Sequence, residues 1–254
     1  MLFNLQNGIV GIYYLRNNSD TDVGIHAAEF LDRDELQYYH RCSSIGRKNH
    51  FLLGRALAKS VLSGITGLPV KNISMERDHY SRLRLKNFCD KSSGNPAGRI
   101  DFNLSHSGEV TAFAAILDGK VGIDVELMER EVHSAALAFF HEREIGYLMS
   151  CGNGGNKNAC RLWTMKESYV KCKGRGLAIP FDSFNVLENH EVIYKSFYIS
   201  GYCISVAVES QHKNINVGIR EMDIGDLHTY VGNQEDICRI WQNPVKKLKS
   251  REEG

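Results

Sequence analysis

The sequence predicts a mixed α and β protein, and three observations point to this fold class. Short runs rich in β-branched and aromatic residues, such as residues 8–15, alternate with longer segments that carry a helical apolar stripe, such as residues 49–63. A chain of 254 residues can build one large domain or two units of roughly 100–150 residues each. The order strand, helix, late strands recurs loosely in both halves, with residues 202–208 echoing residues 110–117. This repetition favours two similar halves, each a small sheet with helices, that meet near Asp118-Gly119, and such a junction is a natural place for a cleft.

The N-terminal half divides into one strand, two helices and a polar stretch. Residues 8–15 (GIVGIYYL) have the composition of a buried strand. A helix is expected over residues 27–39, whose early acidic side chains suit a helix N-terminus. Residues 49–63 predict a second helix, because their apolar side chains fill one broad stripe and Gly64 can end it. The polar, basic and glycine-containing residues 78–98 indicate a loop.

The middle of the chain predicts a hairpin and then a third strand. Residues 100–104 and 110–117 are strand-like, and Ser105-His106-Ser107-Gly108-Glu109 forms the break between them. In residues 121–126 apolar side chains alternate with polar residues or glycine, which is typical of a half-buried strand. Two helices are expected next, at residues 135–140 and 142–149.

The C-terminal part predicts one helix followed by strands. Asn158 can cap a helix over residues 159–173, and Gly174 can close it. Strands are expected at residues 184–187, 192–198 and 202–208. From residue 210 onward the sequence is polar and weakly patterned. The chain is therefore divided into an N-terminal half (1–118), a C-terminal half (119–209) and an extension of unknown role (210–254).

Composition excludes several classes of protein. With 43% hydrophobic and 24% charged residues, the chain resembles an ordinary soluble globular protein. Its 31 Lys and Arg against 30 Asp and Glu give a net charge of +1, which predicts neither nucleic-acid nor membrane binding. Seven cysteines without CxxC spacing or a paired-histidine signature indicate neither a disulfide framework nor a zinc site. Because no signal-peptide pattern and no apolar run of ~18 residues occurs, we expect a cytoplasmic protein.

The strand at residues 121–126 carries the first candidate chemistry. Because apolar side chains alternate with Asp124 and Glu126, both carboxylates emerge on the same face. An Asp-x-Glu pair is common on solvated strand edges and does not make a metal site by itself. Joined by a third carboxylate, from Glu167, the pair would offer Mg²⁺ the oxygen ligands it prefers and leave positions for water and phosphate.

The last expected helix carries the second candidate chemistry. Glu167 and Lys171 are four residues apart, so they share a helix face in the favourable order. Such a pair is usually a surface ion pair. Here Trp163 and Tyr169 flank it, which favours partial burial, and buried charges need partners. Beside a metal, Lys171 could meet a phosphoryl oxygen and stabilise the charge of a leaving phosphate.

Ser105 and His106, in the break between two strands, are the third candidate. A Ser-His pair is typical of a catalytic dyad, of a core histidine and of a turn alike. The chain has neither a Gly-x-Ser-x-Gly elbow nor a third acid in a recognisable order, which argues against a hydrolase. We interpret the hydroxyl and the imidazole as contacts to a phosphate or nucleotide, because both are good partners for oxygen.

These segments resemble a known family when they are taken in order. FNLSHS, GIDVE, FFHERE, LWTMKESYVKCKGRGL and PFDSF, within roughly residues 49–208, resemble the 4′-phosphopantetheinyl transferase superfamily of the Sfp type. The resemblance implies two similar α/β halves around a pseudo-twofold axis, with coenzyme A bound between them. It also implies a holo-acyl-carrier-protein synthase activity that transfers 4′-phosphopantetheine to a serine of an acyl or peptidyl carrier protein, leaves adenosine 3′,5′-bisphosphate, and works as a self-sufficient monomer.

The same resemblance assigns roles to residues of this chain. Asp124, Glu126 and Glu167 match the magnesium ligands. Glu167 also matches the general base for the carrier serine. Lys171 matches the lysine that contacts the phosphate and protonates the departing group. Glu144 matches the acidic position of the FF-x-x-x-E motif, in a supporting role.

The coenzyme A contacts follow the family only in part. Ser105 and His106 match contact positions. Where family members commonly carry Gly-Lys-Pro, this chain has Gly94-Asn95-Pro96, so the lysine expected near the 3′-phosphate is missing. Its loss predicts a narrowed preference for coenzyme A over dephospho-coenzyme A. The charge could be replaced by Arg82, Arg84, Lys86 or Arg99, or from the first half by Arg47, Lys48 or Arg55.

Two other functions remain open at this point. A magnesium-dependent phosphohydrolase could use the same acids with water as the nucleophile. A non-catalytic carrier-binding paralogue is compatible with the missing lysine, although the intact acids and Lys171 argue against it. The carrier could belong to fatty-acid, polyketide, nonribosomal peptide or siderophore synthesis.

Overall fold

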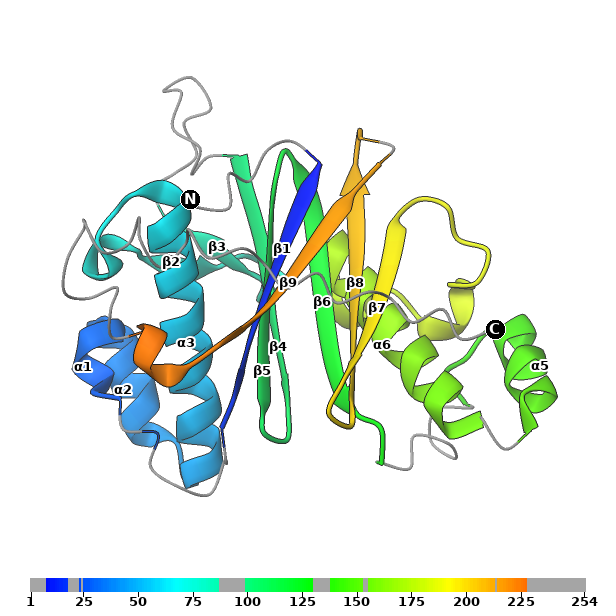
Figure 1. Cartoon of the computed structure of the whole chain (residues 1–254), viewed down its shortest axis with the longest axis horizontal. Coiled ribbons are helices and arrows are strands. Elements are labelled where there is room, and N and C mark those ends of the chain that lie inside the picture. The colour runs from blue at the N-terminus through cyan, green and yellow to red at the C-terminus, as the bar shows by residue number, and fades with distance from the viewer. Residues whose placement is uncertain are drawn as a thin grey trace.

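Two sheets stand in the middle of the molecule, and helices cover their outer sides (Figure 1). The computed structural model describes residues 8–17, 23, 25–86, 99–129, 138–152, 155–212 and 214–227. The first sheet has the strand order β4 (Ile100–Ser107), β5 (Val110–Leu117), β1 (Ile9–Arg16) and β9 (Asn216–Met222). The second sheet has the order β6 (Gly119–Leu127), β8 (Tyr202–Ser210) and β7 (Ile193–Ile199).

Each sheet has its own helices. On the first lies α3 (Ile45–Thr66), and α1 (Ala27–Phe30) and α2 (Arg33–Arg41) pack against this helix. On the second lies α6 (Gly155–Lys173), and α5 (Glu142–Ser150) packs against its outer side. A small hairpin of β2 (Met75–Arg77) and β3 (Leu83–Leu85) forms a separate two-stranded sheet that contacts β4. Three short 3₁₀ turns lie at Val70–Asn72, Gly176–Ala178 and Phe181–Ser183, and residues 224–227 are helical. This arrangement confirms the predicted mixed fold of two halves, each a small sheet with helices.

One apolar core joins the two halves. Alternate residues of the strands face it, because side chains of a strand point to opposite faces. In β1, Val10, Ile12 and Tyr14 enter this shared core, whereas Tyr13 and Leu15 pack with the α3 side. The second sheet contributes to the shared core through its buried strands β6 and β8. The halves are therefore held together by continuous burial of apolar surface as well as by polar contacts.

Helix α6 lies unusually close to strand β6, and Gly122 makes this approach possible. A Cβ at Gly122 would collide with the backbone of Ser168 and Cys172 on the helix. Gly122 lies two residues before Asp124, on the strand face that turns toward α6. Because of this close contact, the strand that carries Asp124 and Glu126 lies directly against the helix that carries Glu167.

Several predicted boundaries are wrong for identifiable reasons. The helix expected over residues 27–39 is two helices, because Asp32 starts α2 with a capping box that includes Glu35. Helix α3 passes through Gly64 and ends at Gly67, whose φ of 72° supplies the left-handed C-terminal conformation. Helix α6 begins before Asn158, the residue predicted to cap it.

Other differences concern strands. The Ser105-His106-Ser107 segment, predicted as a break, lies inside β4, and only Gly108-Glu109 forms the turn to β5. Residues 184–187 form no strand. The first part of the loop expected over residues 78–98 contains β3, and its remainder lies outside the described residues. Of the helix expected at 135–140, residues 135–137 lie outside the described residues, and residues 138–140 form a turn and no helix.

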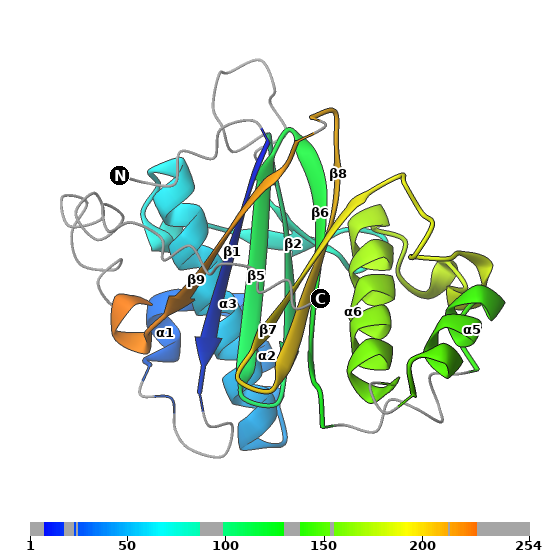
Figure 2. The ribbon, with the colours of Figure 1, turned by 45° about the vertical axis from the view of Figure 1, so that its right-hand side comes forward.

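The segment beyond residue 210, for which no element was predicted, contributes a strand to the opposite half. Strand β9 pairs parallel with β1 along the edge of the first sheet, where Figure 2 shows the two side by side. Its two buried side chains, Ile219 and Met222, pack on opposite faces of the sheet, and its other residues are partly buried or exposed. The strand therefore lacks a regular alternation, which explains why the sequence pattern is weak. Among the described residues, no helix combines the length and apolar character needed to cross a lipid bilayer.

Candidate active site

Two serines of β4 hold the two acids of β6. Ser105 donates its hydroxyl to Asp124 Oδ1 at 2.8 Å, and Ser107 donates to Glu126 Oε2 at 2.9 Å. Asp124 is almost fully buried, with 4% of its surface exposed. The predicted emergence of both acids on one strand face is compatible with these contacts, because both acids reach toward the same neighbouring strand. The sequence analysis expected the Ser105 hydroxyl to contact a ligand, and in the structure it contacts Asp124.

Lys171 reaches from α6 to the same group. Its Nζ donates to Asp124 Oδ1 at 2.6 Å and to Ser105 Oγ at 3.1 Å. Its side chain remains 27% exposed, so the ammonium is not sealed from solvent. A cation that is held by two acceptors and still reaches solvent can interact with an incoming anion.

Glu167 lies one helical turn before Lys171 and feels the charges of both strand acids. Burial raises the pKa of the Glu167 carboxyl, and the neighbouring Asp124 and Glu126 raise it further, while Lys171 opposes them. The charges of Asp124 and Glu126 therefore act on Glu167, and the joint role of the three acids as metal ligands stays a prediction. A raised pKa makes the ionised carboxylate a stronger base.

The acids fit a hard divalent cation by their chemistry. Asp124 Oδ2 is buried and has no hydrogen-bond partner, so one carboxylate oxygen of the site is unsatisfied. Carboxylate oxygens are the ligands that Mg²⁺ takes in proteins. As they stand, no three acidic, histidine or cysteine side chains among the described residues form a group able to hold a metal ion. The ammonium of Lys171 instead supplies the positive charge beside Asp124.

A cavity of about 440 Å³ opens next to these residues, between α3, the β2–β3 hairpin and β4. The four residues that the sequence proposed as coenzyme A contacts in addition to Lys171 all line it: Arg47, Arg55, Ser105 and His106. The structure therefore brings these predicted contacts together, although their role stays a prediction. Arg77, which the sequence did not single out, lines the same cavity.

Most of the candidate cations that could replace the missing lysine are already paired. Arg55 pairs with Glu35 at 2.7 Å, and Arg84 contacts both Asp78 and Asp101 at 3.1 Å. Arg99 pairs with Asp118. Lys48 lies over the ring of Tyr39, and position 95 lies outside the described residues.

Two guanidinium groups of the cavity differ from these. No carboxylate of the described residues pairs with Arg47 or Arg77, and both side chains are exposed. Within the part of the chain that the structure describes, the side chain of Arg77 donates one hydrogen bond, to the carbonyl of Ser81 at 2.7 Å. The sequence did not indicate a role for Arg77, because this residue lies in an exposed polar stretch. Its place at the cavity depends on how the β2–β3 hairpin packs on β4. These two side chains are the cavity's available anion partners.

Two histidines form one wall of the cavity. The rings of His50 and His106 stack with centroids 4.4 Å apart. His50 Nε2 lies 2.9 Å from the carbonyl oxygen of Gly108, in the turn after β4. Burial lowers the pKa of His106 to about 4, with further lowering from His50 and Lys171. His106 is therefore neutral at physiological pH and offers a hydrogen-bonding ring rather than a charge.

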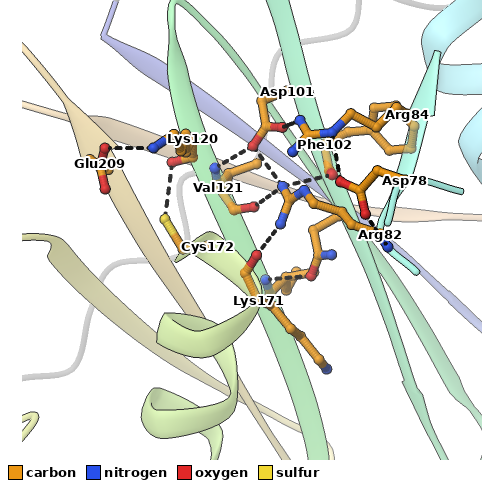
Figure 3. A network of polar contacts seen from close by, with 12 residues as sticks. Asp78, Arg82, Arg84, Asp101, Phe102, Lys120, Val121, Lys171, Cys172 and Glu209 are labelled. Carbon is orange, nitrogen blue, oxygen red and sulfur yellow. Dashed lines mark hydrogen bonds and ion pairs between the residues drawn. The ribbon is translucent and has the colours of Figure 1, made fainter. Parts of the chain in front are cut away.

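Arg82 fastens the two halves together at the back of the site (Figure 3). Its guanidinium contacts Asp101 Oδ2 at 2.6 Å, the carbonyl oxygen of Val121 at 2.7 Å and that of Phe102 at 3.1 Å. It also donates to the carbonyl of Lys171, in the last turn of α6. Arg82 thus serves the packing of α6 rather than an exposed ligand, and it fixes the helix turn that carries the Lys171 side chain.

Glu144, given a supporting role by the FF-x-x-x-E motif, forms a closed buried pair. Its carboxylate lies 2.8 Å from Lys166 Nζ, and neither side chain is exposed. Lys166 also donates to the carbonyls of Phe181 and Phe184, each at 2.6 Å. Glu144 in turn accepts from the backbone N–H of Val186. This network anchors α5 and the segment after residue 180 to α6.

Comparisons with known proteins agree on one family. A model described as "4'-phosphopantetheinyl transferase superfamily" matches residues 120–221, and one described as "4'-phosphopantetheinyl transferase, N-terminal" matches residues 21–118. The chain is 32% identical over 182 residues to the 4′-phosphopantetheinyl transferase gsp of Aneurinibacillus migulanus, covering 70% of this chain and 72% of that protein. It is 30% identical over 182 residues to the 4′-phosphopantetheinyl transferase ffp of Bacillus subtilis, covering 70% and 75%.

A mammalian relative extends the likeness. The L-aminoadipate-semialdehyde dehydrogenase-phosphopantetheinyl transferase of Rattus norvegicus is 25% identical over 206 residues, covering 73% of this chain and 65% of that protein. The likeness therefore spans both halves of the chain and proteins of distant organisms.

Proposed function

The chain belongs to the 4′-phosphopantetheinyl transferase superfamily and is a transferase of that kind, and on this premise we propose its reaction in detail. It transfers the 4′-phosphopantetheine group of coenzyme A to a serine hydroxyl of an apo acyl or peptidyl carrier protein, with Mg²⁺ as cofactor. The other product is adenosine 3′,5′-bisphosphate. The chain acts in the cytoplasm as a monomer whose partners are coenzyme A and the carrier, and it engages neither nucleic acid nor membrane.

One observation carries this proposal: the acids and Lys171 stand at the edge of a cationic cavity. Ser105 belongs to both, because its hydroxyl contacts Asp124 and Lys171 while its side chain lines the cavity. A ligand with a reacting phosphate at Lys171 would therefore have its remainder beside Ser105 and His106. This continuity matches a nucleotide whose phosphates and nucleoside occupy adjoining sites.

The charge of the cavity indicates which end of coenzyme A enters it. Arg47 and Arg77 lack carboxylate partners among the described residues and favour an anion. The phosphorylated nucleoside end of coenzyme A is anionic, whereas its pantetheine arm is neutral. The nucleoside end therefore lies in the cavity, and the arm leaves toward the carrier. This placement also gives the 3′-phosphate cationic partners despite the asparagine at position 95.

The proposed chemical step uses Glu167 and Lys171. Glu167 takes the proton of the carrier serine, whose oxygen forms a bond to the phosphorus that bears the pantetheine arm. The bond from that phosphorus to the bridging oxygen of the pyrophosphate breaks, and the leaving bisphosphate keeps the electron pair. Lys171 donates a hydrogen bond to the oxygen that gains charge.

Asp124, Glu126 and Glu167 would hold the Mg²⁺ ion. When bound, the ion supplies positive charge that neutralises the pyrophosphate. The unsatisfied Oδ2 of Asp124 supports this assignment, since it is a buried acceptor without a donor.

The direct test is transfer to a carrier protein. The chain is incubated with coenzyme A, Mg²⁺ and a panel of apo carriers, and the carriers are weighed intact by mass spectrometry. We expect one carrier or more to gain the mass of a single phosphopantetheine, and excess chelator to stop the gain. Release of phosphopantetheine without any change of carrier mass would instead identify a phosphohydrolase, and binding without either reaction would identify a non-catalytic carrier-binding protein.

A further inference from the structure

Strand β4 is joined to strand β6 by its side chains. Every second residue of β4 from Asp101 to Ser107 accepts a hydrogen bond from a backbone N–H of β6, and each bond spans 20 residues or so of sequence. The N–H groups belong to Val121, Ile123, Val125 and Leu127, and they meet Asp101, Asn103, Ser105 and Ser107 in that order. We call this set the β4–β6 ladder. It fixes the register of one half of the molecule against the other.

The last two rungs of the ladder differ from the first two. Ser105 Oγ accepts from the N–H of Val125 at 3.4 Å and donates to Asp124, the residue just before it. Ser107 Oγ repeats the pattern, accepting from the N–H of Leu127 at 3.4 Å and donating to Glu126. Each serine therefore binds one acid and the amide that follows it.

A hydroxyl is suited to this double task. It has one donor and two acceptor positions on a single atom, so the amide and the carboxylate are tied to the same point. An aspartate at either position could accept the amide hydrogen bond but would repel the neighbouring acid. The repetition of the same pattern on two rungs indicates that it serves the two acids and is not an accident of one side chain.

We propose that Ser107 is a positioning residue that holds the Glu126 carboxylate in the orientation needed to bind a divalent cation. Ser105 has a second function, since it also contacts Lys171 and lines the cavity. Ser107 does not line the cavity and is 8% exposed, so its role runs through Glu126. The proposal rests on the metal site of the proposed function, and it makes the ladder the device by which the N-terminal half orients a ligand of the C-terminal half.

The test measures cation binding apart from turnover. Mn²⁺ is titrated into the full chain, with coenzyme A present, and free Mn²⁺ is followed by electron paramagnetic resonance. We expect Ser107→Ala to raise the Mn²⁺ concentration for half-saturation about tenfold or more, the size of effect typical for residues that orient metal ligands. Ser107→Thr keeps the hydroxyl, and its Mn²⁺ concentration for half-saturation should stay within about threefold of that of the wild type. Valine has nearly the same shape as threonine but no hydroxyl, so Ser107→Val should behave like Ser107→Ala.

A matched control separates orientation from general loosening. Ser196 shares a hydrogen bond with Ser205 at 2.9 Å within the second sheet, and its side chain hydrogen-bonds to no acid of the described residues. Ser196→Ala should therefore bind Mn²⁺ like the wild type. Equal weakening in Ser196→Ala, or wild-type binding in both folded Ser107→Ala and Ser107→Val, would overturn the proposal. If thermal unfolding shows that only Ser107→Thr folds, the serine has a structural role and the proposal fails as well.

Parallel transfer assays distinguish this inference from the proposed function. If the wild type modifies a carrier and binds Mn²⁺ while Ser107→Val binds it equally well, the proposed function stands and the positioning role falls. If the wild type neither binds Mn²⁺ nor modifies any carrier, the proposed function fails and takes this inference with it.

Discussion

Two lysines of α6, five residues apart, occupy opposite kinds of site. Lys166 is fully buried, and its three acceptors, the Glu144 carboxylate and the carbonyls of Phe181 and Phe184, match its three donors. Lys171 has two acceptors, Asp124 and Ser105, and is 27% exposed. One helix thus carries a closed ion pair that fastens elements together and an open one that can still receive a ligand.

The comparison shows which features separate a structural lysine from one that is open to a ligand. Both lysines contact a carboxylate, so pairing alone does not identify a functional residue. Unused hydrogen-bonding capacity, access to solvent and the nearby unsatisfied oxygen of Asp124 mark the open pair. We therefore expect changes at the closed pair to reduce stability, and changes at the open pair to reduce turnover.

The largest effect is expected from Glu167→Gln, which removes the proposed base beside the open pair and keeps the shape of the side chain. Turnover should fall by ~10²–10⁴-fold, the usual contribution of a positioned base. The thermal unfolding midpoint should stay near that of the wild type. Rates of transfer to an apo carrier, followed by intact mass, give the measurement, with Glu188→Gln, at a surface pair with Arg143, as the control. A near-normal rate for Glu167→Gln would exclude its role as base.

Lys166→Met tests the closed pair. It leaves Glu144 buried without its cationic partner, and breaking such a pair costs about 3–5 kcal/mol. The free energy of unfolding should fall by this amount in denaturant titrations. Adding Glu144→Met should cost less than the sum of the two single changes, because the second change removes the unpaired charge. Strict additivity would show that the two side chains do not depend on each other.

Lys171→Met tests the open pair, on the same helix and with the same replacement as Lys166→Met. Loss of a cation that stabilises developing charge should lower turnover by ~10²–10³-fold. Its destabilisation, measured with Mg²⁺ present, should be clearly smaller than that of Lys166→Met, because its side chain is partly solvated. If the two variants exchanged these effects, the distinction between closed and open pair would be wrong.

Arg77→Gln should give the smallest effect on the reaction. It tests whether the ligand-binding region around Lys171 extends across the cavity to Arg77. If Arg77 contacts the 3′-phosphate, the KM for coenzyme A should rise roughly tenfold, since hydrogen bonds to charged groups contribute about 1.5–3 kcal/mol. The KM for dephospho-coenzyme A, which lacks that phosphate, should not change. Arg143→Gln, in the other half, is the matched control. An equal rise for both substrates would assign Arg77 to another part of the ligand.

Local patterns predicted the parts of the site that lie within single elements. Asp124 and Glu126 share a strand face by alternation, and Glu167 and Lys171 share a helix face by spacing. The close approach that unites these elements depends on Gly122, whose role becomes visible only when α6 lies against it. The periodicity of a sequence predicts which side chains share a face of a helix or strand. The distance between two elements depends on how they pack, which periodicity does not predict.

Contacts between distant segments escaped prediction. Ser105 and Ser107 were assigned to a break because polar residues usually interrupt a buried strand, yet their hydroxyls replace backbone partners along β6. Arg82 was a candidate ligand contact because it is basic, and its burial among carbonyls depends on strand register. Strand β9 was missed because its two buried side chains, Ile219 and Met222, face opposite sides of the sheet and leave no regular alternation.

The proposed metal site is tested most directly by locating a bound divalent cation. Crystals of the chain grown with Mn²⁺ and coenzyme A would reveal the metal in an anomalous difference map. The account predicts one strong peak coordinated by Asp124, Glu126 and Glu167, with Lys171 beside the pyrophosphate. A peak that any of these three acids fails to reach, or no peak near them, would contradict it.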